Sequence, residues 1–257
     1  MLLTIDAGNT NTVFAVFDGK EKKVSFRLST QGQRTEDEIA AFIMQLLQLN
    51  QLAVSDIKRT VMASVVPDAI QPLANACKRL FGKEPVIIGR DINVSGLMEI
   101  KMPNPQYVGD DRILNGAAAK ELYGKSPAIV IDCGTATTFD VIDENGAFIG
   151  GVIAPGLSLA MQALYMAAAK LPKIEILKPE KAIGNATIPA MQSGAFWGYI
   201  GLVEKILSQI TAELPEKPLV IATGGLAGLV AGDIPAIEII EPDLTLYGLR
   251  LLAEKDL

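Results

Sequence analysis

One pattern, a strand followed by an acidic turn and a second strand, occurs twice in the chain. In the first copy an apolar run over residues 2–5 ends at Asp6 in the segment DAGNT, and in the second a run over residues 128–131 ends at Asp132 in the segment DCGT. In both copies an alternating apolar stretch, another turn and a third apolar stretch follow, as in antiparallel strands joined by tight turns. The two aspartates lie 126 positions apart, so the chain is expected to contain two similar halves.

Helices and strands alternate after each of these three-stranded units. Thr35 and Glu38 form a capping box ahead of apolar residues at helical spacing, which predicts a helix over residues 35–47. Further periodic segments predict strands at residues 60–65, 85–88 and 219–221 and helices at residues 67–81, 113–122, 157–169, 189–214 and 244–253. This alternation indicates the α/β class.

The length suits two domains. The chain has 257 residues, and a single domain has about 150. Because 49% of the residues are hydrophobic, the chain can bury a sizeable core, and wholesale disorder is excluded. We predict an N-terminal domain over residues 1–115 and a C-terminal domain over residues 116–257, connected by the helix at residues 113–122.

Charge and composition limit the possible chemistry. The chain contains no histidine, which excludes Ser-His-Asp catalysis, histidine-ligated zinc and imidazole bases. The net charge is −6, so most of the surface repels nucleic acid and anionic membranes. We therefore expect a small-molecule partner, with neither nucleic acid nor membrane bound.

The two cysteines and the apolar segments indicate where the protein works. Cys77 and Cys133 match no metal-binding spacing and are too few for a disulfide scaffold, so reduced, buried thiols are expected. The N-terminal residues lack a cationic leader ahead of an apolar stretch. The most apolar stretch, residues 149–161, is too short and too rich in glycine and proline to cross a bilayer. We expect a cytoplasmic protein.

The acidic turns are candidates for phosphate binding. Gly8 permits a tight turn whose backbone amides can converge on phosphate oxygens, and Thr10 and Thr12 add hydroxyl groups. An aspartate at the end of a strand, such as Asp6, can hold Mg²⁺ through water. A plain hairpin turn capped by Asp and Asn is the alternative. The second copy at Asp132 favours phosphate binding, because two such turns can bind one nucleotide.

Two further segments carry candidate chemistry. Gly224 and Gly225 follow a strand in the segment TGGLA, where the backbone can approach a ring or ribose, although a close-packed turn explains them equally well. Asp110, Asp111 and Arg112 precede a helix in the segment GDDR, where a carboxylate can accept a hydroxyl proton and a guanidinium can bind an anion. Acids that complement a helix dipole are the alternative there. In a chain without histidine, a kinase needs a carboxylate base, and GDDR is the best-placed candidate.

The segments DAGNT, GDDR, DCGTATT, GGVIAPG, TGGLA and PDLTLYGL occur in this order along nearly the whole chain. Together they resemble the type III pantothenate kinases. The resemblance implies an α/β fold of two similar RNase H-like domains, as in the actin, hexokinase and Hsp70 superfamily, flanking an ATP cleft. It also implies ATP-dependent phosphorylation of pantothenate to 4′-phosphopantothenate, the first step of coenzyme A biosynthesis.

The resemblance also implies roles for individual residues. Asp111 matches the proton acceptor, Asp132 the ligand of a monovalent cation (K⁺ or NH₄⁺), and Thr135 a contact to the ATP phosphates, which Mg²⁺ accompanies. Thr187 matches a pantothenate contact donated across a homodimer interface, so the substrate site would be completed by a second copy of the chain. The implied pantothenate segment is Gly109, Asp110, Asp111 and Arg112, and the implied phosphate segment is Asp6, Ala7, Gly8, Asn9, Thr10, Asn11, Thr12 and Val13.

One position departs from the family pattern, and two other functions remain open. Met102 stands where many members place a substrate-contacting tyrosine, and Tyr107 lies nearby but out of register. A regulatory protein that keeps the ATP fold without catalysis is one alternative, which the intact Asp111 and Arg112 disfavour. A kinase of the same superfamily acting on a sugar or another small alcohol is the second, which Thr187 and PDLTLYGL disfavour.

Overall fold

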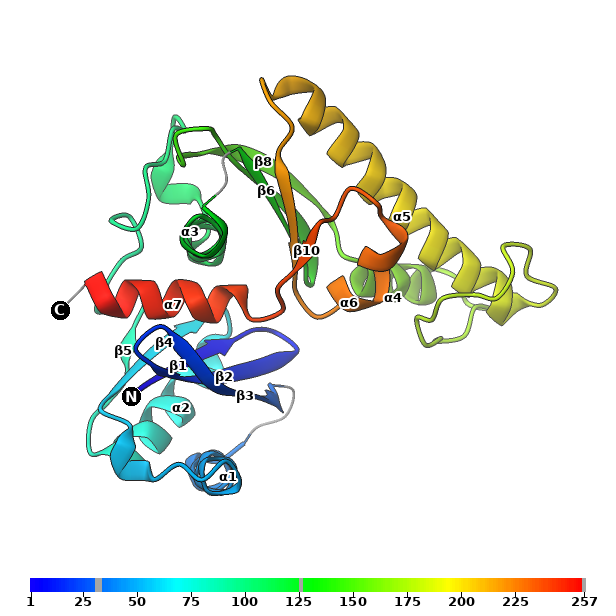
Figure 1. Ribbon diagram of the computed structural model, residues 1–257. Helices are drawn as coiled ribbons and strands as arrows, with labels where there is room; N and C mark the ends of the chain where they lie inside the picture. The colour runs from blue at the N-terminus through cyan, green and yellow to red at the C-terminus, as the bar shows by residue number, and fades with distance from the viewer. Residues whose placement is uncertain (31–33, 125–126, 256–257) are drawn as a thin grey trace. The chain divides into compact units, whose positions relative to one another are not determined.

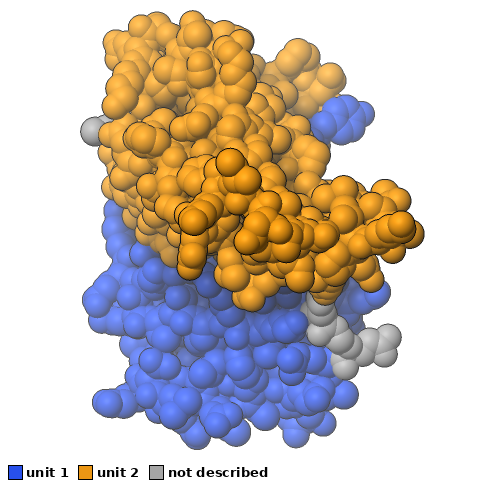
Figure 2. Space-filling view, turned by 90° about the vertical axis from the view of Figure 1, so that its right-hand side faces the viewer, with its two compact units in different colours: residues 1–97, 107–118, 243–257 blue, residues 98–106, 119–242 orange. Residues whose placement is uncertain are grey.

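Two five-stranded mixed sheets, each with its own helices, organise the chain (Figure 1). The computed structural model describes residues 1–30, 34–124 and 127–255. The chain divides into unit 1, residues 1–97, 107–118 and 243–257, and unit 2, residues 98–106 and 119–242, coloured separately in Figure 2. Among the described residues, no helix has both the length and the apolar character needed to cross a membrane.

The sheet of unit 1 runs in the order β3-β2-β1-β4-β5. Strand β2 is antiparallel to its neighbours β1 and β3, whereas β4 and β5 run parallel to β1. The strands are β1 (Leu2–Ala7), β2 (Asn11–Asp18), β3 (Glu21–Ser29), β4 (Arg59–Ser64) and β5 (Val86–Ile87).

Helices cover both faces of this sheet (Figure 1). On one face, α1 (Glu36–Leu49) and α2 (Pro67–Phe81) bury a core that includes Ile5, Phe14 and Ile43. On the other, α7 (Leu244–Lys255) contacts β1, β2 and β4. The capping box predicted at the start of α1 is confirmed: the Thr35 side chain accepts from the Glu38 backbone N–H, and the Glu38 carboxylate accepts from the Thr35 N–H.

The sheet of unit 2 repeats the same arrangement, in the order β10-β9-β6-β7-β8. Strand β6 takes the place of β1, with β7 and β8 antiparallel on one side and β9 parallel on the other. The strands are β6 (Ala128–Cys133), β7 (Ala136–Ile142), β8 (Phe148–Pro155), β9 (Leu219–Thr223) and β10 (Ile239–Ile240). The duplicated order predicted from the two acidic turns is therefore confirmed.

Helices of unit 2 enclose a second core. Helix α5 (Thr187–Glu213) packs Phe196, Ile200 and Val203 against Ile129 and Ile131 of β6. The remaining helices are α3 (Asp110–Tyr123), α4 (Leu157–Ala167) and the short α6 (Ala227–Val230), and single 3-10 turns lie at Val54–Asp56, Pro105–Tyr107 and Ala231–Asp233. Helix α3 begins in unit 1 and ends in unit 2.

The two units do not have the same boundaries as the predicted domains, residues 1–115 and 116–257. Residues 243–257 group with unit 1, because α7 packs on the sheet built from the first strands of the chain. Residues 98–106 group with unit 2, where the Lys101 backbone N–H donates to the carbonyl of Phe148 (2.8 Å) and its ammonium pairs with Asp143 (2.7 Å). Both contacts join residues far apart in sequence, and local patterns do not encode them.

Candidate active site

The first acidic turn spans residues 8–10, between β1 and β2. The Gly8 N–H donates to the carbonyl of Asn11 (3.0 Å), and the carbonyl of Thr10 accepts from the Thr30 N–H (2.9 Å). A Cβ at Gly8 would lie 3.3 Å from the Asn11 carbonyl oxygen, a tight fit for any larger residue. The turn is thus closed by its own backbone.

The predicted phosphate segment alternates between accessible and buried residues. Asn9, Thr10 and Asn11 are exposed, and Asp6, Gly8 and Val13 are half-buried. Thr12 is only 3% exposed, and its hydroxyl bonds that of Thr30 (2.9 Å). Thr12 therefore helps to close the turn, and the buried Ala7 can offer a ligand only its backbone; a role of either residue in phosphate binding stays a prediction.

The second acidic turn has a closely similar geometry. The Gly134 N–H donates to the carbonyl of Ala136 (3.1 Å), as Gly8 does to Asn11 in the first turn. Asp132 occupies the same place in β6 as Asp6 in β1, one residue before the end of its strand. Thr135 is exposed at the tip of the turn. The repeat seen in the sequence is a repeat of backbone hydrogen bonding as well.

Gly224 lies directly against Asp132. It follows β9, which runs parallel to β6, and it adopts a left-handed φ of +89°. A Cβ at this position would come within 2.4 Å of Asp132 Oδ1 and 2.8 Å of the Cys133 backbone nitrogen. Gly225, by contrast, has open space at its Cβ position. The structure thus brings TGGLA and DCGT together within unit 2.

A third segment of unit 2 meets the same turn. Gly156, at the junction of β8 and α4, donates its N–H to the carbonyl of Thr135 (3.1 Å). A Cβ there would lie 2.3 Å from the Thr135 carbonyl oxygen and 2.4 Å from that of Gly134. Carbonyl and carboxylate oxygens such as those of Gly134, Thr135 and Asp132 are of the kind that hard cations take as ligands.

Glycines pack closely against the Asp132 carboxylate. Besides Gly224, Gly134 would place a Cβ 3.4 Å from Asp132 Oδ1. Among the described residues, no group of three or more acidic or cysteine side chains could hold a metal ion. A single carboxylate suits Mg²⁺, which keeps several waters and takes phosphate oxygens as ligands. The residues therefore fit a cation that is bound jointly with a nucleotide.

The GDDR segment lies at the start of α3. Asp111 is exposed, and its Oδ1 accepts a hydrogen bond from the Arg112 backbone N–H (2.9 Å). A Cβ at Gly109 would lie 2.6 Å from the same oxygen, so a larger residue there would displace the Asp111 carboxylate. The carboxylate of Asp111 is held at a helix N-terminus, as in the dipole-complementing alternative, and remains accessible to a substrate.

The carboxyl group of the preceding residue, Asp110, has a different electrostatic environment from that of Asp111. Its Oδ2 lies 3.8 Å from the Cβ position of Gly89, whose φ is +79°. Loss of hydration raises the pKa of Asp110, and the negative charge of Asp111 raises it further. A second carboxylate beside Asp111 thus accepts a proton more readily than an ordinary aspartate.

Thr187 and Met102, the two remaining candidates, both lie among residues of unit 2. Thr187 is the exposed first residue of α5 and lines an apolar cavity of about 600 Å³ between α4 and α5, with Pro155 and Leu157. Met102 is half-buried, and Tyr107 is 82% exposed. The structure therefore joins Thr187 to the segment GGVIAPG and leaves the tyrosine side chain largely in solvent.

One polar contact behind the second turn has no sequence signal. The hydroxyl of Tyr199, on α5, bonds Thr137 Oγ1 (2.7 Å), and both side chains are buried. Burial raises the pKa of the Cys133 thiol, on the adjacent strand β6, to about 11. No spacing rule links residues 62 positions apart. This contact fastens α5 to the strands that carry Asp132.

Comparison with known proteins identifies the family. The family model for type III pantothenate kinase matches residues 2–209. A type III pantothenate kinase from Paramagnetospirillum magneticum is 49% identical, with 97% of this chain and 95% of that protein covered. Another from Rhodospirillum centenum is 48% identical, with 100% and 99% covered.

Solved structures share the fold at low sequence identity. A protein from Campylobacter jejuni described as a Baf family transcriptional activator superposes with a TM-score of 0.58 at 18% identity, covering 99% of this chain and 98% of that one. The ROK hexokinase of Thermus thermophilus gives 0.50 at 12% identity, with 99% of each covered. The predicted fold class, α/β with two similar five-stranded halves, is confirmed, and the hexokinase shares this fold. The chain belongs to the type III pantothenate kinase family.

Proposed function

We propose that the protein transfers the γ-phosphoryl group of ATP to the primary hydroxyl of pantothenate, giving 4′-phosphopantothenate and ADP. The observation that carries this proposal is a family match along nearly the whole chain in which the GDDR carboxylates are intact and Asp111 is accessible. The product places the protein at the first step of coenzyme A biosynthesis, and a cytoplasmic location follows from that role.

The nucleotide is assigned to the acidic turns. Exposed residues of the first turn (Asn9, Thr10 and Asn11) and Thr135 of the second present backbone N–H groups and hydroxyls suited to phosphate oxygens. Gly224 and Gly225 form the backbone surface next to Asp132 that a ribose or ring can approach. Mg²⁺, when bound, would bridge phosphate oxygens and neutralise their charge.

Asp132 is assigned to a monovalent cation. Asp132 Oδ1 lies 3.4 Å from the Cβ position of Gly134 in the same turn, and a carboxylate oxygen suits K⁺ or NH₄⁺ as a partner of the phosphates. A cation here would offset the negative charge that Asp132 itself brings toward a triphosphate.

Asp111 is assigned as the proton acceptor and Arg112 as the anchor of the pantothenate carboxylate. The hydrogen bond from the Arg112 N–H fixes one Asp111 oxygen and orients the other. In phosphoryl transfer most of the rate enhancement comes from positioning and charge stabilisation, so the carboxylate need only orient the hydroxyl and take its proton as transfer proceeds. Gly109, Asp110 and Met102 are assigned to the same substrate region.

We assign a homodimer in which Thr187 contributes to the partner's substrate site. Exposed Thr187, Ile188 and Trp197 on α5, next to the apolar cavity, support an interface on this helix. Light scattering coupled to size exclusion should give about twice the chain mass of 27.3 kDa. A monomer at micromolar concentration would contradict the assignment.

The decisive experiment is a coupled assay of ADP release. We expect ADP release only with pantothenate present, and faster release in potassium or ammonium than in sodium salts. A regulatory protein would bind ATP without turnover, and a sugar or alcohol kinase would turn over with those acceptors and not with pantothenate. Either result would replace the proposed function.

A further inference from the structure

The family segment PDLTLYGL, residues 242–249, has no part in binding nucleotide or pantothenate in the proposed function. It forms the start of α7 and, from Asp243 onward, lies within unit 1. Unit 1 also contains residues 107–118, which include Asp111 and the first turns of α3. The segment and the predicted proton acceptor therefore belong to the same unit.

The first residues of α7 are fastened to the hairpin of β2 and β3. The Asp243 carboxylate, which is buried, accepts from Lys22 Nζ (2.6 Å) and from the Ser25 hydroxyl (2.9 Å). Four residues later, the Tyr247 ring lies edge-on to that of Phe17, with the ring centroids 5.3 Å apart. Salt screens an ion pair with a buried partner only weakly. These contacts set the position of α7 over its sheet.

From this position α7 contacts α3 in two places. The Thr245 hydroxyl donates to Asn115 Oδ1 (2.8 Å), and Asn115 is 1% exposed. Three residues further along α7, a Cβ at Gly248 would lie 2.4 Å from the Leu114 carbonyl oxygen, so a larger residue would push the helices apart. A buried polar group that loses its partner costs free energy. The contact at Asn115 therefore favours one placement of α3.

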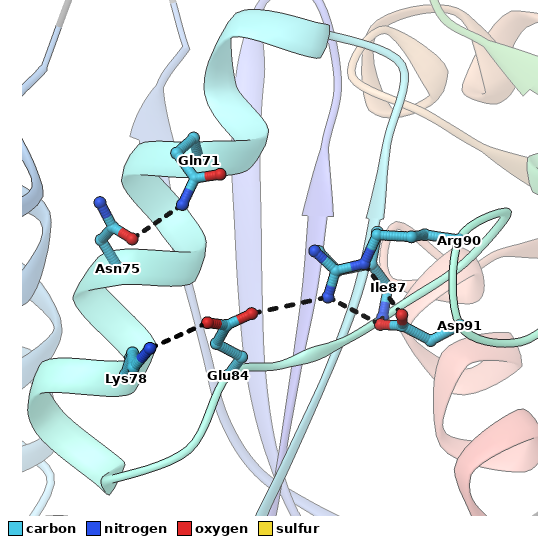
Figure 3. A network of polar contacts seen from close by, with 7 residues as sticks. All are labelled: Gln71, Asn75, Lys78, Glu84, Ile87, Arg90 and Asp91. Atoms are coloured by element: carbon cyan, nitrogen blue, oxygen red, sulfur yellow. Dashed lines mark hydrogen bonds and ion pairs between the residues drawn. The ribbon is translucent and has the colours of Figure 1, made fainter.

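The start of α3 also contacts the turn after β5. Asp110 Oδ2 lies 3.8 Å from the Cβ position of Gly89 in this turn. The polar network of Figure 3 stiffens the turn, because Asp91 accepts from the Ile87 N–H (2.9 Å) and pairs with Arg90 (2.9 Å). The carboxyl of Asp110 thus has a support of its own, in addition to the contact between the helices.

Asn115 stands one turn after Asp111 on α3. Residues four apart lie on the same face of a helix, about 6 Å apart along its axis. In phosphoryl transfer the rate depends on alignment, and a misplacement of about 1 Å can cost about 10²-fold. A movement of the helix at Asn115 would carry the Asp111 carboxylate with it.

We propose that Thr245 is a positioning residue for the phosphoryl transfer. By bonding Asn115 it holds the start of α3, and with it the Asp111 carboxylate, where that carboxylate takes the proton of the substrate hydroxyl. The inference rests on the proposed function, in which Asp111 is the proton acceptor. The role of PDLTLYGL is then to connect the sheet of unit 1 rigidly to the base.

A double-mutant cycle of Thr245→Val and Asp111→Asn tests the proposal in steady-state kinetics. We expect Thr245→Val to lower kcat roughly three- to thirtyfold with little change in KM for pantothenate, because the substrate still binds while the base is displaced. Thr245→Ser keeps the donor and should restore kcat. In a chain that already carries Asp111→Asn, adding Thr245→Val should lower kcat by less than about twofold. A full further loss in that background would overturn the proposal.

Thr35→Val is the matched control. It removes the same hydroxyl from the N-cap of α1, also in unit 1, and should lower the melting temperature by about 2–4 °C while kcat holds. An equal fall of kcat in Thr35→Val and Thr245→Val would show a loss of stability alone and would overturn the proposal. If Thr245→Val does not fold, Thr245→Ala removes the same donor and takes its place in the cycle.

Hydrogen exchange separates this inference from the proposed function, since it needs no turnover. We expect the backbone amides of residues 112–118 to exchange faster in Thr245→Val and at an unchanged rate in Thr35→Val. Equal exchange in the two variants would overturn the inference, whatever the chain phosphorylates. If the chain phosphorylates another alcohol in place of pantothenate, the proposed function fails, and the cycle run with that alcohol still decides on Thr245.

Discussion

A single methyl group at position 224 would collide with the Asp132 carboxylate. The left-handed backbone and a Cβ contact of 2.4 Å act together there, so Gly224→Ala should lower the free energy of unfolding by more than about 1 kcal/mol. It should also weaken ADP binding, because Asp132 must move. Thermal denaturation and calorimetry measure both effects.

Gly225→Ala is the matched control for stability. Its Cβ position is open and its φ is not left-handed, so the melting temperature should change by no more than about 1 °C, as for a surface substitution. Equal destabilisation by the two substitutions would show that the contact with Asp132 is not what requires glycine at position 224.

Asp111→Asn should lower kcat for pantothenate phosphorylation by about 10²–10⁴-fold, the range for loss of a general base. The amide keeps an oxygen that can accept from the Arg112 N–H, so the melting temperature should hold. Asp110→Asn is the neighbouring comparison and should reduce kcat less. Near-normal turnover of Asp111→Asn in steady-state kinetics would remove Asp111 from the role of base.

Burial of Cys133 makes stability depend on pH in the alkaline range. The folded state raises the thiol pKa from 9.0 to about 11, so it holds a proton that the unfolded chain releases. The free energy of unfolding should therefore fall as the pH rises from about 9 to 11. Urea titrations at pH 8 and 10 should show a smaller fall in Cys133→Ala than in the unchanged chain. Equal falls would contradict the prediction.

At the scale of the elements, the contact between α5 and β7 depends on one buried hydroxyl pair. Tyr199→Phe would leave the fully buried Thr137 hydroxyl without its partner, at a cost of about 1–3 kcal/mol. Tyr165→Phe, on α4, removes the hydroxyl of a tyrosine that is 46% exposed, so it should lower the free energy of unfolding only slightly. Chemical denaturation of the two variants gives the comparison. If Tyr199→Phe leaves the free energy of unfolding unchanged, water has replaced the tyrosine as the partner of the Thr137 hydroxyl.

Elements were predictable where the signal is local. The Thr35 capping box, the proline that starts α2 and the glycines of the hairpin turns act within a few residues, and each element appears where expected. Helix α4 ends two residues earlier than predicted, at Ala167. The Tyr199–Thr137 bond and the strand at Ile239–Ile240 were missed, because each is fixed by packing against distant residues.

At the scale of the whole molecule, unit 1 requires both ends of the described chain. Helix α7 buries four leucines, at positions 244, 246, 249 and 252, each stabilising by about 2 kcal/mol. Deletion of residues 243–257 should therefore unfold unit 1, since about 8 kcal/mol is comparable to the stability of a domain. Unit 2 retains its own core, so hydrogen exchange should show protection in β6 and α5 and its loss in β1 and β4. Uniform loss of protection would show that the units do not fold separately.

The duplicated architecture could be predicted from the sequence because two acidic turns with equal local chemistry mark equivalent positions. The packing of residues 243–257 on the first strands could not be predicted. The apolar residues of α7 show that the helix has a buried face, but their spacing does not say which of the two sheets that face packs on. Gly248, whose Cβ position lies 2.4 Å from the Leu114 carbonyl oxygen, shows how specific that fit is. Candidate ligands of the nucleotide could be named from turn chemistry, whereas a cavity lined by Leu2, Arg59 and Arg250 draws on residues from five separate segments.

The placement of α7 has a consequence for biogenesis. During translation the strands of unit 1 leave the ribosome first, but α7, which covers one face of their sheet, is synthesised only after residues 119–242. Those residues can complete their core while synthesis continues. The nascent chain must therefore carry an uncovered, aggregation-prone sheet surface until α7 emerges, which makes early chaperone engagement of this sheet the expected route to the native protein.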